Sequence, residues 1–362
     1  MSDFGQPDTF GLFEYDEGLK IAGSPWYLDS RKPRARCLVS HGHSDHLPWG
    51  DRNVPPDPKK VHGTAVCHPI TAQIGRLRGG LAQGIMEIGY HEPTKVSDDL
   101  EVTLSPAGHV LGSAMIHVRR GEHSLLYTGD YKLRRSRTVP IAEPLEADVL
   151  VMESTYGKPF FRFPPTAELE ERLVELCTTA MKRGKQPMVF GYALGKAQEI
   201  IKILVDAGLP VTMHGAVANL TDIYLEHGVD FGTGLLRRYK ASDFKGNGAL
   251  DLEERGVLVA PPREARGNFA GQFGEHCTKI MMSGWALLSG AQFRYGVDYC
   301  LPLSDHGDFD ELVQTIERVR PKVVLSHHGG ADFPDILMKM GLDQKLGFRI
   351  ALAKPPAQMT LF

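Results

Sequence analysis

Segment 41–46, with the sequence HGHSDH, places three imidazoles and one carboxylate within a single short stretch. It follows the apolar stretch 35–40, which predicts a buried strand whose end can project several side chains toward one point. Such groups are costly to bury without partners, whereas imidazole nitrogen and carboxylate oxygen are usual ligands of divalent metals. We therefore interpret the segment as a metal site; an exposed histidine-rich loop is the alternative.

The spacing inside this segment suits two metal ions. His41 and His43 lie two residues apart, so that on an extended chain their side chains point to the same side and suit one ion. Asp45 and His46 lie past the turn and suit a second ion. Two ions need more ligands than this segment holds, so further donors are expected downstream.

Later positions repeat the arrangement of a polar side chain at the end of a predicted strand. These positions are His109, Asp130 and the doublet His327-His328. One such residue is more often a turn residue or a helix cap, but the repetition after a ligand-dense segment favours metal ligands. A carboxylate at position 130 could bridge two ions.

A pair of divalent cations is suited to hydrolysis at phosphorus. Two ions ~3.5–4 Å apart lower the pKa of a shared water and stabilise both oxygens of an in-line displacement. Zinc by itself brings bound water to a pKa of about 7. The leaving alkoxide then needs a proton from a nearby acid. His306, which follows the apolar stretch 299–303, is a candidate for that acid, and a surface histidine beside a helix is the alternative.

The composition indicates an ordinary globular chain. Its 362 residues, 42% of them hydrophobic and 23% charged, predict one large or two medium domains. A net charge of -3 carries no global signature of a nucleic acid or membrane partner, so a polyanion would need a local basic patch. The polar segment 1–17 predicts no secretory signal, and no apolar run approaches the ~20 residues of a membrane span. Five scattered cysteines, never spaced C-x-x-C, argue against a disulfide framework and favour a reducing cytoplasm.

The first part of the chain is rich in predicted strands. Asp29, at the end of a predicted strand that begins at Trp26, either orients a metal-binding histidine or ends a turn. A helix is predicted from Pro69 onward. Further strands are predicted at 64–67, 100–105, 114–118, 124–127 and 148–152. This mixture predicts a layered α/β architecture.

From residue 166 onward helices and strands alternate. Helical stripes at 169–180 and 197–204 alternate with strands at 188–190 and 211–213, which predicts parallel strands with crossover helices. Segment 231–251 predicts a loop, and 257–260 and 279–283 predict two more strands. The last part of the chain returns to the pattern of the first part. It comprises a helix over 309–319 capped by Asp308, a strand at 323–325 and a last helix from 333. One domain inserted into another explains this order.

These motifs resemble those of a known family. HGHSDH matches the H-x-H-x-D-H signature of the metallo-β-lactamase superfamily, and 106–113 and 128–132 resemble its next two ligand motifs. Four further segments resemble motifs of the nucleic-acid-processing β-CASP branch. They are Glu153-Ser154-Thr155-Tyr156-Gly157, Ser304-Asp305-His306, His328-Gly329 and the strand-to-helix segment 192–199. Within the branch, the chain resembles the bacterial ligase-associated DNA exonucleases most, at segments 190–192, 214–217, 260–262 and 283–285. The resemblance runs from about residue 18 to residue 346.

The resemblance implies a metallo-β-lactamase αββα sandwich with an inserted β-CASP α/β domain. The sandwich would comprise 1–162 and 297–362, and the inserted domain would comprise 163–296. The implied metal ligands are His41, His43 and His109 on one ion, Asp45, His46 and His328 on the other, and Asp130 between them. Asp45 also counts among the implied catalytic residues, with His306 as the acid and Glu153 holding it. Zinc, the metal we expect, fits these ligands well, and manganese also accepts imidazole and carboxylate.

Basic and aromatic residues near these motifs are candidates for substrate contacts. The basic candidates are Lys132, Arg134, Arg135, Arg137, Lys158, Arg162 and Lys196, the last at a predicted helix start. A solvated loop is the alternative for them. Trp26, Trp49, Phe160 and Phe161 either stack on bases or pack in the core.

The resemblance implies a metal-dependent nuclease in which activated hydroxide attacks a phosphodiester. The leading expectation is a cytoplasmic DNA exonuclease acting in DNA repair with an ATP-dependent DNA ligase. An RNA-processing nuclease of the mRNA 3′-end type is the main alternative. His328 resembles the RNA-processing members, because several DNA-processing members have valine at that motif. A hydrolase of small thioesters or lactams and a catalytically silent nucleic-acid-binding scaffold are the other hypotheses.

Overall fold

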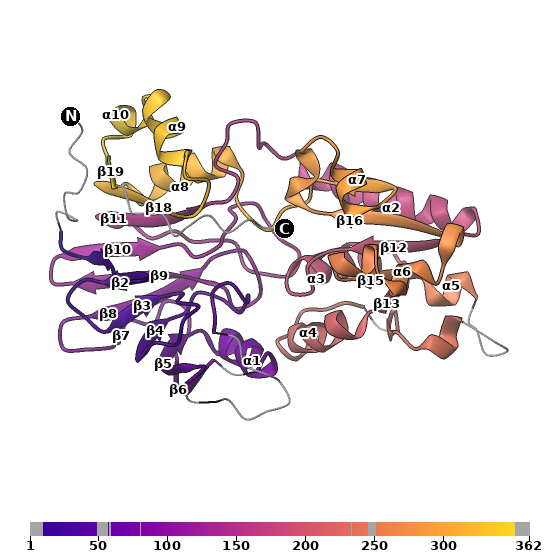
Figure 1. The fold of residues 1–362 in the computed structure, drawn as a ribbon, viewed down its shortest axis with the longest axis horizontal. Helices are drawn as coiled ribbons and strands as arrows, with labels where there is room; N and C mark the ends of the chain where they lie inside the picture. Colours follow the sequence, from indigo (N-terminus) through magenta and orange to yellow (C-terminus); the bar gives the residue numbers. More distant parts are fainter. Residues whose placement is uncertain are drawn as a thin grey trace. The chain divides into compact units, whose positions relative to one another are not determined.

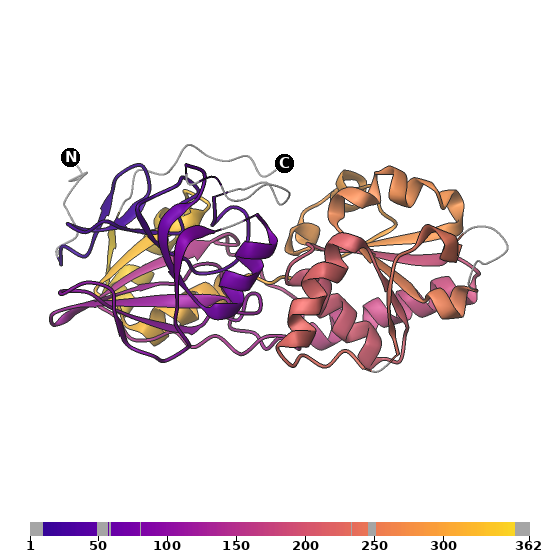
Figure 2. The same cartoon turned by 90° about the horizontal axis from the view of Figure 1, so that it is seen from below.

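The computed structural model describes residues 10–48, 57, 59–79, 81–232, 234–244 and 251–351. Figures 1 and 2 show the ribbon from two directions. The described residues form two compact units. The first comprises the chain up to Arg135, 139–162 and the chain from His306 onward, and the second comprises 136–138 and 163–305. The first unit is therefore built from both ends of the chain.

One sheet of the first unit has the strand order β1-β2-β3-β4-β5-β6. Its strands are β1 Phe13–Tyr15, β2 Leu19–Ile21, β3 Trp26–Leu28, β4 Arg36–Leu38, β5 His62–Cys67 and β6 Ala82–Glu87. The strands from β3 to β6 are parallel, whereas β1, β2 and β3 pair in antiparallel fashion. Helix α1, Pro69–Leu77, begins at the predicted proline, and the side chain of His68 caps its first turn.

The other sheet of this unit has the order β19-β18-β11-β10-β9-β8-β7. Its strands are β7 Thr94–Lys95, β8 Glu101–Pro106, β9 Ala114–Arg120, β10 His123–Tyr127, β11 Val149–Ser154, β18 Val323–Gly329 and β19 Arg349–Ala351. Strands β7 to β10 are antiparallel, and β10, β11, β18 and β19 are parallel. The first and last parts of the chain therefore share one sheet.

The packing of the first unit follows from alternation along its strands. Val149 and Val151 of β11 join the apolar core between the two sheets, whereas Leu150 and Met152 join the core beneath the C-terminal helices. These helices are α8 Phe309–Val319, α9 Phe333–Lys339 and α10 Leu342–Leu346. On the outer face of the first sheet, Ala72 of α1 packs in a third apolar cluster. The unit thus has helices outside two stacked sheets.

The second unit has one sheet in the order β14-β13-β15-β12-β16-β17, with every pair parallel. Its strands are β12 Gln186–Phe190, β13 Val211–Met213, β14 Leu236–Arg238, β15 Val257–Ala260, β16 Cys277–Met282 and β17 Tyr299–Leu301. Its α-helices are α2 Thr166–Lys182, α3 Lys196–Asp206, α4 Gly215–Glu226, α5 Leu252–Arg255, α6 Asn268–Gly271 and α7 Ala291–Tyr295. The predicted parallel strands with crossover helices are confirmed.

Two details differ from the prediction. The second unit extends to Asp305 rather than to 296, because β17 pairs with β16 and so carries the chain across the sheet before it leaves. Segment 231–251 contains strand β14, which the sequence pattern did not indicate because its residues Leu236, Arg237 and Arg238 include only one apolar side chain. Residues 233 and 245–250 lie outside the described part of the chain.

Among the described residues, no helix combines the length and the apolar character that crossing a membrane requires.

Candidate metal centre

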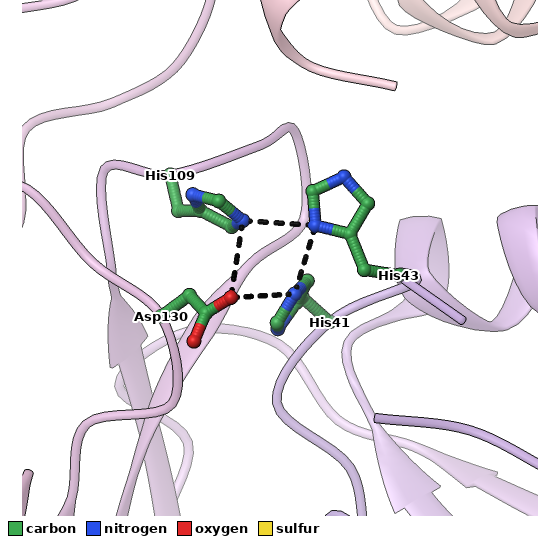
Figure 3. Close-up of side chains that lie close together, drawn as sticks. All are labelled: His41, His43, His109 and Asp130. Carbon is green, nitrogen blue, oxygen red and sulfur yellow. Dashed lines mark hydrogen bonds and ion pairs between the residues drawn. The ribbon is translucent and has the colours of Figure 1, made fainter. Parts of the chain in front are cut away.

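Four of the predicted ligands lie together in the first unit. The ligating atoms of His41, His43, His109 and Asp130 all lie within 4.8 Å of one another. Figure 3 shows these side chains pointing toward a common centre. Nδ1 of His43 lies 3.1 Å from Nε2 of His41 and 3.0 Å from Nε2 of His109. Segments that are far apart in the sequence thus present three imidazole nitrogens and a carboxylate oxygen to one point.

Backbone geometry explains how these side chains reach the site. Gly129, directly before Asp130, has a φ of +53°, and a Cβ there would lie 2.5 Å from Oγ of Ser40. Gly108, directly before His109, has a φ of +73°, and a Cβ would lie 2.4 Å from the carbonyl oxygen of Lys132. Both positions need glycine because a left-handed turn passes against another chain segment. In these two motifs, the glycine directly before the ligand therefore permits the close approach.

A second group surrounds the same carboxylate. Oδ2 of Asp130 lies 3.3 Å from Nε2 of His46, and it also lies 3.6 Å from Nε2 of His41 and 3.7 Å from Nε2 of His109. The ring centroid of His328 lies 4.8 Å from that of His46. One oxygen therefore faces both groups of histidines, as a bridging ligand would.

Asp45 and the histidine doublet complete the predicted set less tightly. Oδ2 of Asp45 lies 3.9 Å from Nε2 of His46, and its side chain is 48% exposed, so this carboxylate lies at the rim of the cluster. His328 lies beside His46, and His327 packs edge-on against His328 at a centroid distance of 4.2 Å. His328 has a φ of +58°, which is uncommon for a residue with a Cβ. This strained backbone is typical of a functional position.

Asp29 connects the two groups of histidines through hydrogen bonds. Its Oδ2 accepts hydrogen bonds from Nδ1 of His46 at 2.8 Å, the hydroxyl of Tyr127 at 2.9 Å and the hydroxyl of Ser40 at 2.5 Å. The Ser40 hydroxyl in turn lies 2.9 Å from Nδ1 of His41. A carboxylate that holds the far nitrogen of a ligand histidine fixes its tautomer and orientation. Of the two predicted roles for Asp29, the contacts favour the orienting role.

His306 and Glu153 form a pair next to this cluster. Nδ1 of His306 lies 3.0 Å from each carboxylate oxygen of Glu153. Glu153 is buried and also accepts a hydrogen bond from the backbone N–H of Tyr131 at 2.8 Å. The ring of His306 lies 4.8 Å from that of His109, centroid to centroid. Glu153 thus holds Nδ1 of His306, and the ring of His306 lies beside the cluster.

The electrostatics of the cluster suit metal ligands. Burial lowers the pKa of His41 well below its usual range and also lowers that of His328, so both imidazoles are neutral. Burial by itself would raise the pKa of Asp130, but His46 and His306 hold it well below its usual range. Neutral imidazole and ionised carboxylate are the protonation states that bind metals.

His46 is the exception among these ligands. Burial opposes a charge on it, but Asp130 and Asp29 raise the pKa of His46 well above its usual range. The two carboxylates therefore favour a positive charge on this imidazole.

The residues also pass a test of fit. Nε2 of His328 is buried and has no hydrogen-bond partner among the described residues. An unpaired buried nitrogen is costly, so a ligand for it is expected. Together with the donor set of imidazole and carboxylate, this orphaned atom shows that the cluster could bind metal ions. The donor set does not distinguish zinc from manganese.

Several predicted substrate contacts lie in places that argue against that role. Lys132 is 2% exposed and Lys196 is 1% exposed. Nζ of Lys196 donates to the carbonyl oxygen of Leu303 at 2.9 Å and pairs with Asp305 at 3.0 Å. Both side chains are buried and the ammonium of Lys196 is paired, so neither placement favours a contact with a phosphate at the surface.

The remaining basic candidates differ in their surroundings. Lys158 and Arg162 are about half exposed and form single ion pairs with Asp332 and Asp310. Both guanidinium ends of Arg137 are engaged by Glu170 and Asp206, and Arg134 is held by Glu311 and Asp308. Arg135 is exposed, and none of the described carboxylates pairs with it. Arg135 is therefore the candidate whose charge is most available.

The aromatic candidates separate in the same way. Trp26 is 2% exposed and packs in the core between the sheets, and Phe161 is 3% exposed. Phe160 is 58% exposed, and its ring lies 4.3 Å from that of Phe161. Trp49 lies outside the described residues. Phe160 alone among the described three presents a face to solvent.

Sequence reasoning missed two residues of this site. Tyr127 and Ser40 reach Asp29 with their hydroxyl groups, yet each reads in the sequence as part of a strand. The only signal that could have found them is position, because each directly precedes or nearly precedes a ligand motif.

A buried cluster of imidazoles and carboxylate at the strand ends of an α/β sandwich defines a candidate metal-binding protein. No family model matches the chain. The chain is 35% identical over 333 residues to a protein of Opitutus terrae named probable DNA ligase. The matched residues make up 91% of this chain and 30% of that protein. It is 34% identical to the transcription termination factor FttA of Pyrococcus horikoshii, over 49% of this chain and 28% of FttA.

It is also 29% identical to RNase aCSPSF2 of Saccharolobus solfataricus, over 52% of this chain and 42% of that protein. The chain thus spans less than half the length of each of these relatives. The link to ligases rests on the Opitutus protein.

Proposed function

We propose that this protein is a metal-dependent nuclease that hydrolyses phosphodiester bonds and that its substrate is RNA. The observation that carries the proposal is the convergence of His41, His43, His109 and Asp130, with the His306–Glu153 pair beside them. Under this proposal the first unit is a metallo-β-lactamase domain and the second unit is an inserted β-CASP domain.

The predicted ligand sets follow the two groups around Asp130. His41, His43 and His109 would hold one ion, and Asp45, His46 and His328 the other, with Asp130 between them. When bound, two divalent ions supply a water of lowered pKa and positive charge for the phosphate oxygens. Asp29 keeps Nδ1 of His46 engaged, so that Nε2 faces the site.

His306 would protonate the oxygen that leaves phosphorus. Glu153 holds Nδ1 of His306 from a buried position, which orients the ring, and Nε2 would carry the proton that is given to the leaving oxygen. A positioned acid of this kind contributes roughly 10²–10⁴-fold to a rate. A scaffold that only binds nucleic acid needs neither an acid such as His306 nor a carboxylate such as Glu153 to hold it, so this pair favours an enzyme.

RNA is proposed as the substrate for two reasons. Relatives named RNase and transcription termination factor support an RNA-processing role better than a role in DNA repair. The last motif of this chain has His328, where the RNA-processing members of the resembled branch also have histidine. The leading expectation from the sequence, a DNA exonuclease, therefore has less support than its alternative.

DNA is kept as a second candidate because of one observation. The relative named probable DNA ligase is similar over 91% of this chain, whereas the RNase and FttA relatives are similar over about half of it. If DNA is the substrate, we propose a DNA ligase as the partner of this protein.

One digestion experiment tests both candidates. Matched RNA and DNA strands, single and double, labelled at the 5′ or the 3′ end, are incubated with the metal-depleted protein and with added zinc or manganese. We expect metal-dependent cleavage of RNA, which Asp130→Asn abolishes because both ion sites lose their shared ligand. Degradation of DNA with RNA left intact would instead support the second candidate. If the folded protein cleaved neither with either metal, the nuclease proposal would be wrong.

A further inference from the structure

Arg134 lies where two segments of the first unit meet. Its Nη2 donates a hydrogen bond to the backbone carbonyl oxygen of His306 at 2.8 Å. The same guanidinium pairs with the carboxylate of Glu311 and lies 3.3 Å from that of Asp308. The backbone N–H of Arg134 also donates to Glu311 at 2.5 Å. One residue therefore holds the turn that carries His306 through both its side chain and its backbone.

Neighbouring residues of the same segment add to this connection. The backbone N–H of Gly307 donates to the carbonyl oxygen of Tyr131 at 2.6 Å. The N–H of Tyr131 donates to Glu153, which is the carboxylate that holds Nδ1 of His306. Residues 131–134 directly follow Asp130. The segment that leaves the metal cluster therefore sets the position of the His306 turn.

The first turn of α8 makes this arrangement rigid. The side chain of Asp308 accepts from the N–H of Glu311 at 3.0 Å, and the side chain of Glu311 accepts from the N–H of Asp308 at 3.0 Å. Both carboxylates are mostly buried, with exposures of 11% and 10%. Without the guanidinium between them, two negative charges would remain close together in a poorly solvated place.

We propose that Arg134 is a positioning residue for the reaction, which acts by fixing His306 relative to Asp130. This proposal rests on the proposed function, because it assigns Arg134 a role only if His306 is the acid. It replaces the expectation that Arg134 contacts a substrate phosphate, since its side chain is 22% exposed and its guanidinium is bound on two sides within the protein.

The proposal predicts a dependence on the leaving group. In the reaction water adds to phosphorus and loses one proton to solvent, and the bond from phosphorus to one bridging oxygen breaks. That oxygen takes the bonding electrons and a proton from His306, which regains a proton from solvent. A bridging sulfur at the same position leaves as a thiolate and needs no proton, so cleavage of a sulfur-linked substrate does not depend on a well-placed acid. A residue that positions only the acid should matter for the oxygen-linked substrate alone.

The experiment compares Arg134→Ala, Arg134→Lys and a matched control on both substrates. The control is Arg120→Ala, because Arg120 also pairs with a carboxylate, Asp99 at 3.0 Å, and donates to a backbone carbonyl, Ala22 at 2.7 Å. Its side chain is 24% exposed, close to the 22% of Arg134. Product ends from the unmodified protein identify which bridging oxygen to replace by sulfur.

We expect kcat on the oxygen-linked substrate to fall about tenfold or more in Arg134→Ala, part of the roughly 10²–10⁴-fold that a general acid supplies. KM and the rate on the sulfur-linked substrate should stay close to those of the unmodified protein. Arg134→Lys should show the same selectivity, because one ammonium cannot hold Glu311 and the His306 carbonyl in the geometry of the fork. Arg120→Ala should leave the ratio of the two rates unchanged.

Two results would overturn the proposal. If Arg134→Ala slowed both substrates equally, or slowed neither, the residue would not act through the acid. Retained cleavage of the sulfur-linked substrate shows that the variant is folded and binds substrate, and Arg134→Lys provides a milder change if the alanine variant does not fold. Failure of the unmodified protein to cleave either substrate would instead contradict the proposed function itself.

Discussion

Oδ2 of Asp29 lies 2.8 Å from Nδ1 of His46, and both side chains are buried. Asp29 has a φ of +45°, so its backbone adopts a conformation that residues with a Cβ rarely occupy. Such strain persists where the surrounding structure requires it. Here it turns the carboxylate toward three donors at once, His46, Tyr127 and Ser40.

This relationship predicts the effect of Asp29→Asn. The amide can accept from His46 through its oxygen, but it brings two N–H donors into a place built for acceptors. We expect metal affinity to fall about 10–100-fold, the usual cost of losing a partner behind a ligand. Titration of the metal-depleted protein against a chromogenic chelator measures this change. The exposed Asp99→Asn is the control, and unchanged affinity in Asp29→Asn would show that Asp29 does not orient a ligand.

A second prediction concerns His306→Ala. Because His306 is proposed as the acid and not as a ligand, the variant should keep its bound metal while kcat falls roughly 10²–10⁴-fold. Elemental analysis of the purified variant and a single-turnover assay separate the two effects. Loss of metal together with activity would mean that His306 is a ligand or a structural residue.

A third prediction separates two neighbouring arginines. Arg135 is exposed, whereas Arg137 is bound by Glu170 and Asp206. Arg135→Ala should weaken nucleic acid binding most at low salt and reduce the slope of log affinity against log salt by about 1. Arg137→Ala should leave that slope unchanged. Binding titrations over a series of salt concentrations test this, and equal weakening by Arg135→Ala at every salt concentration would remove Arg135 from the phosphate contacts.

A fourth prediction concerns stability and pH. Burial lowers the pKa of His62 from 6.5 to about 4, and the N–H of Arg34 donates to its Nδ1 at 3.1 Å. Between pH 6.5 and about 4, His62 is therefore protonated in the unfolded chain but neutral in the folded protein. The free energy of unfolding should accordingly fall as the pH drops through this window, by on the order of 3 kcal/mol from this residue.

Urea unfolding from pH 4 to pH 7, with a chelator present, measures the effect. His62→Gln should remove this share of the pH dependence while keeping an acceptor for Arg34. The exposed His91→Gln provides the control. The prediction is wrong if the difference in unfolding free energy between His62→Gln and the unmodified protein does not change with pH.

Much of the local structure could be predicted from sequence because it depends on neighbours along the chain. The helix that Asp308 caps spans Phe309–Val319, and strand β13 spans Val211–Met213, both as the pattern indicated. Proline at position 69 and the capping pair Asp308 and Glu311 act within one turn of the chain, so their effects are visible in sequence. Strand β14 was missed because it is mostly charged and lies at the edge of its sheet.

The sequence by itself indicated which residues could bind metal, because a ligand-dense segment is followed by further imidazole and carboxylate groups at strand ends, and such groups are costly to bury without partners. Only the tertiary structure decided which charges remain available around them. Lys196, Lys132 and Arg134 have the residue types of a phosphate site, yet burial and carboxylate partners engage them within the fold. Burial and pairing depend on segments far apart along the chain, and no local pattern records them.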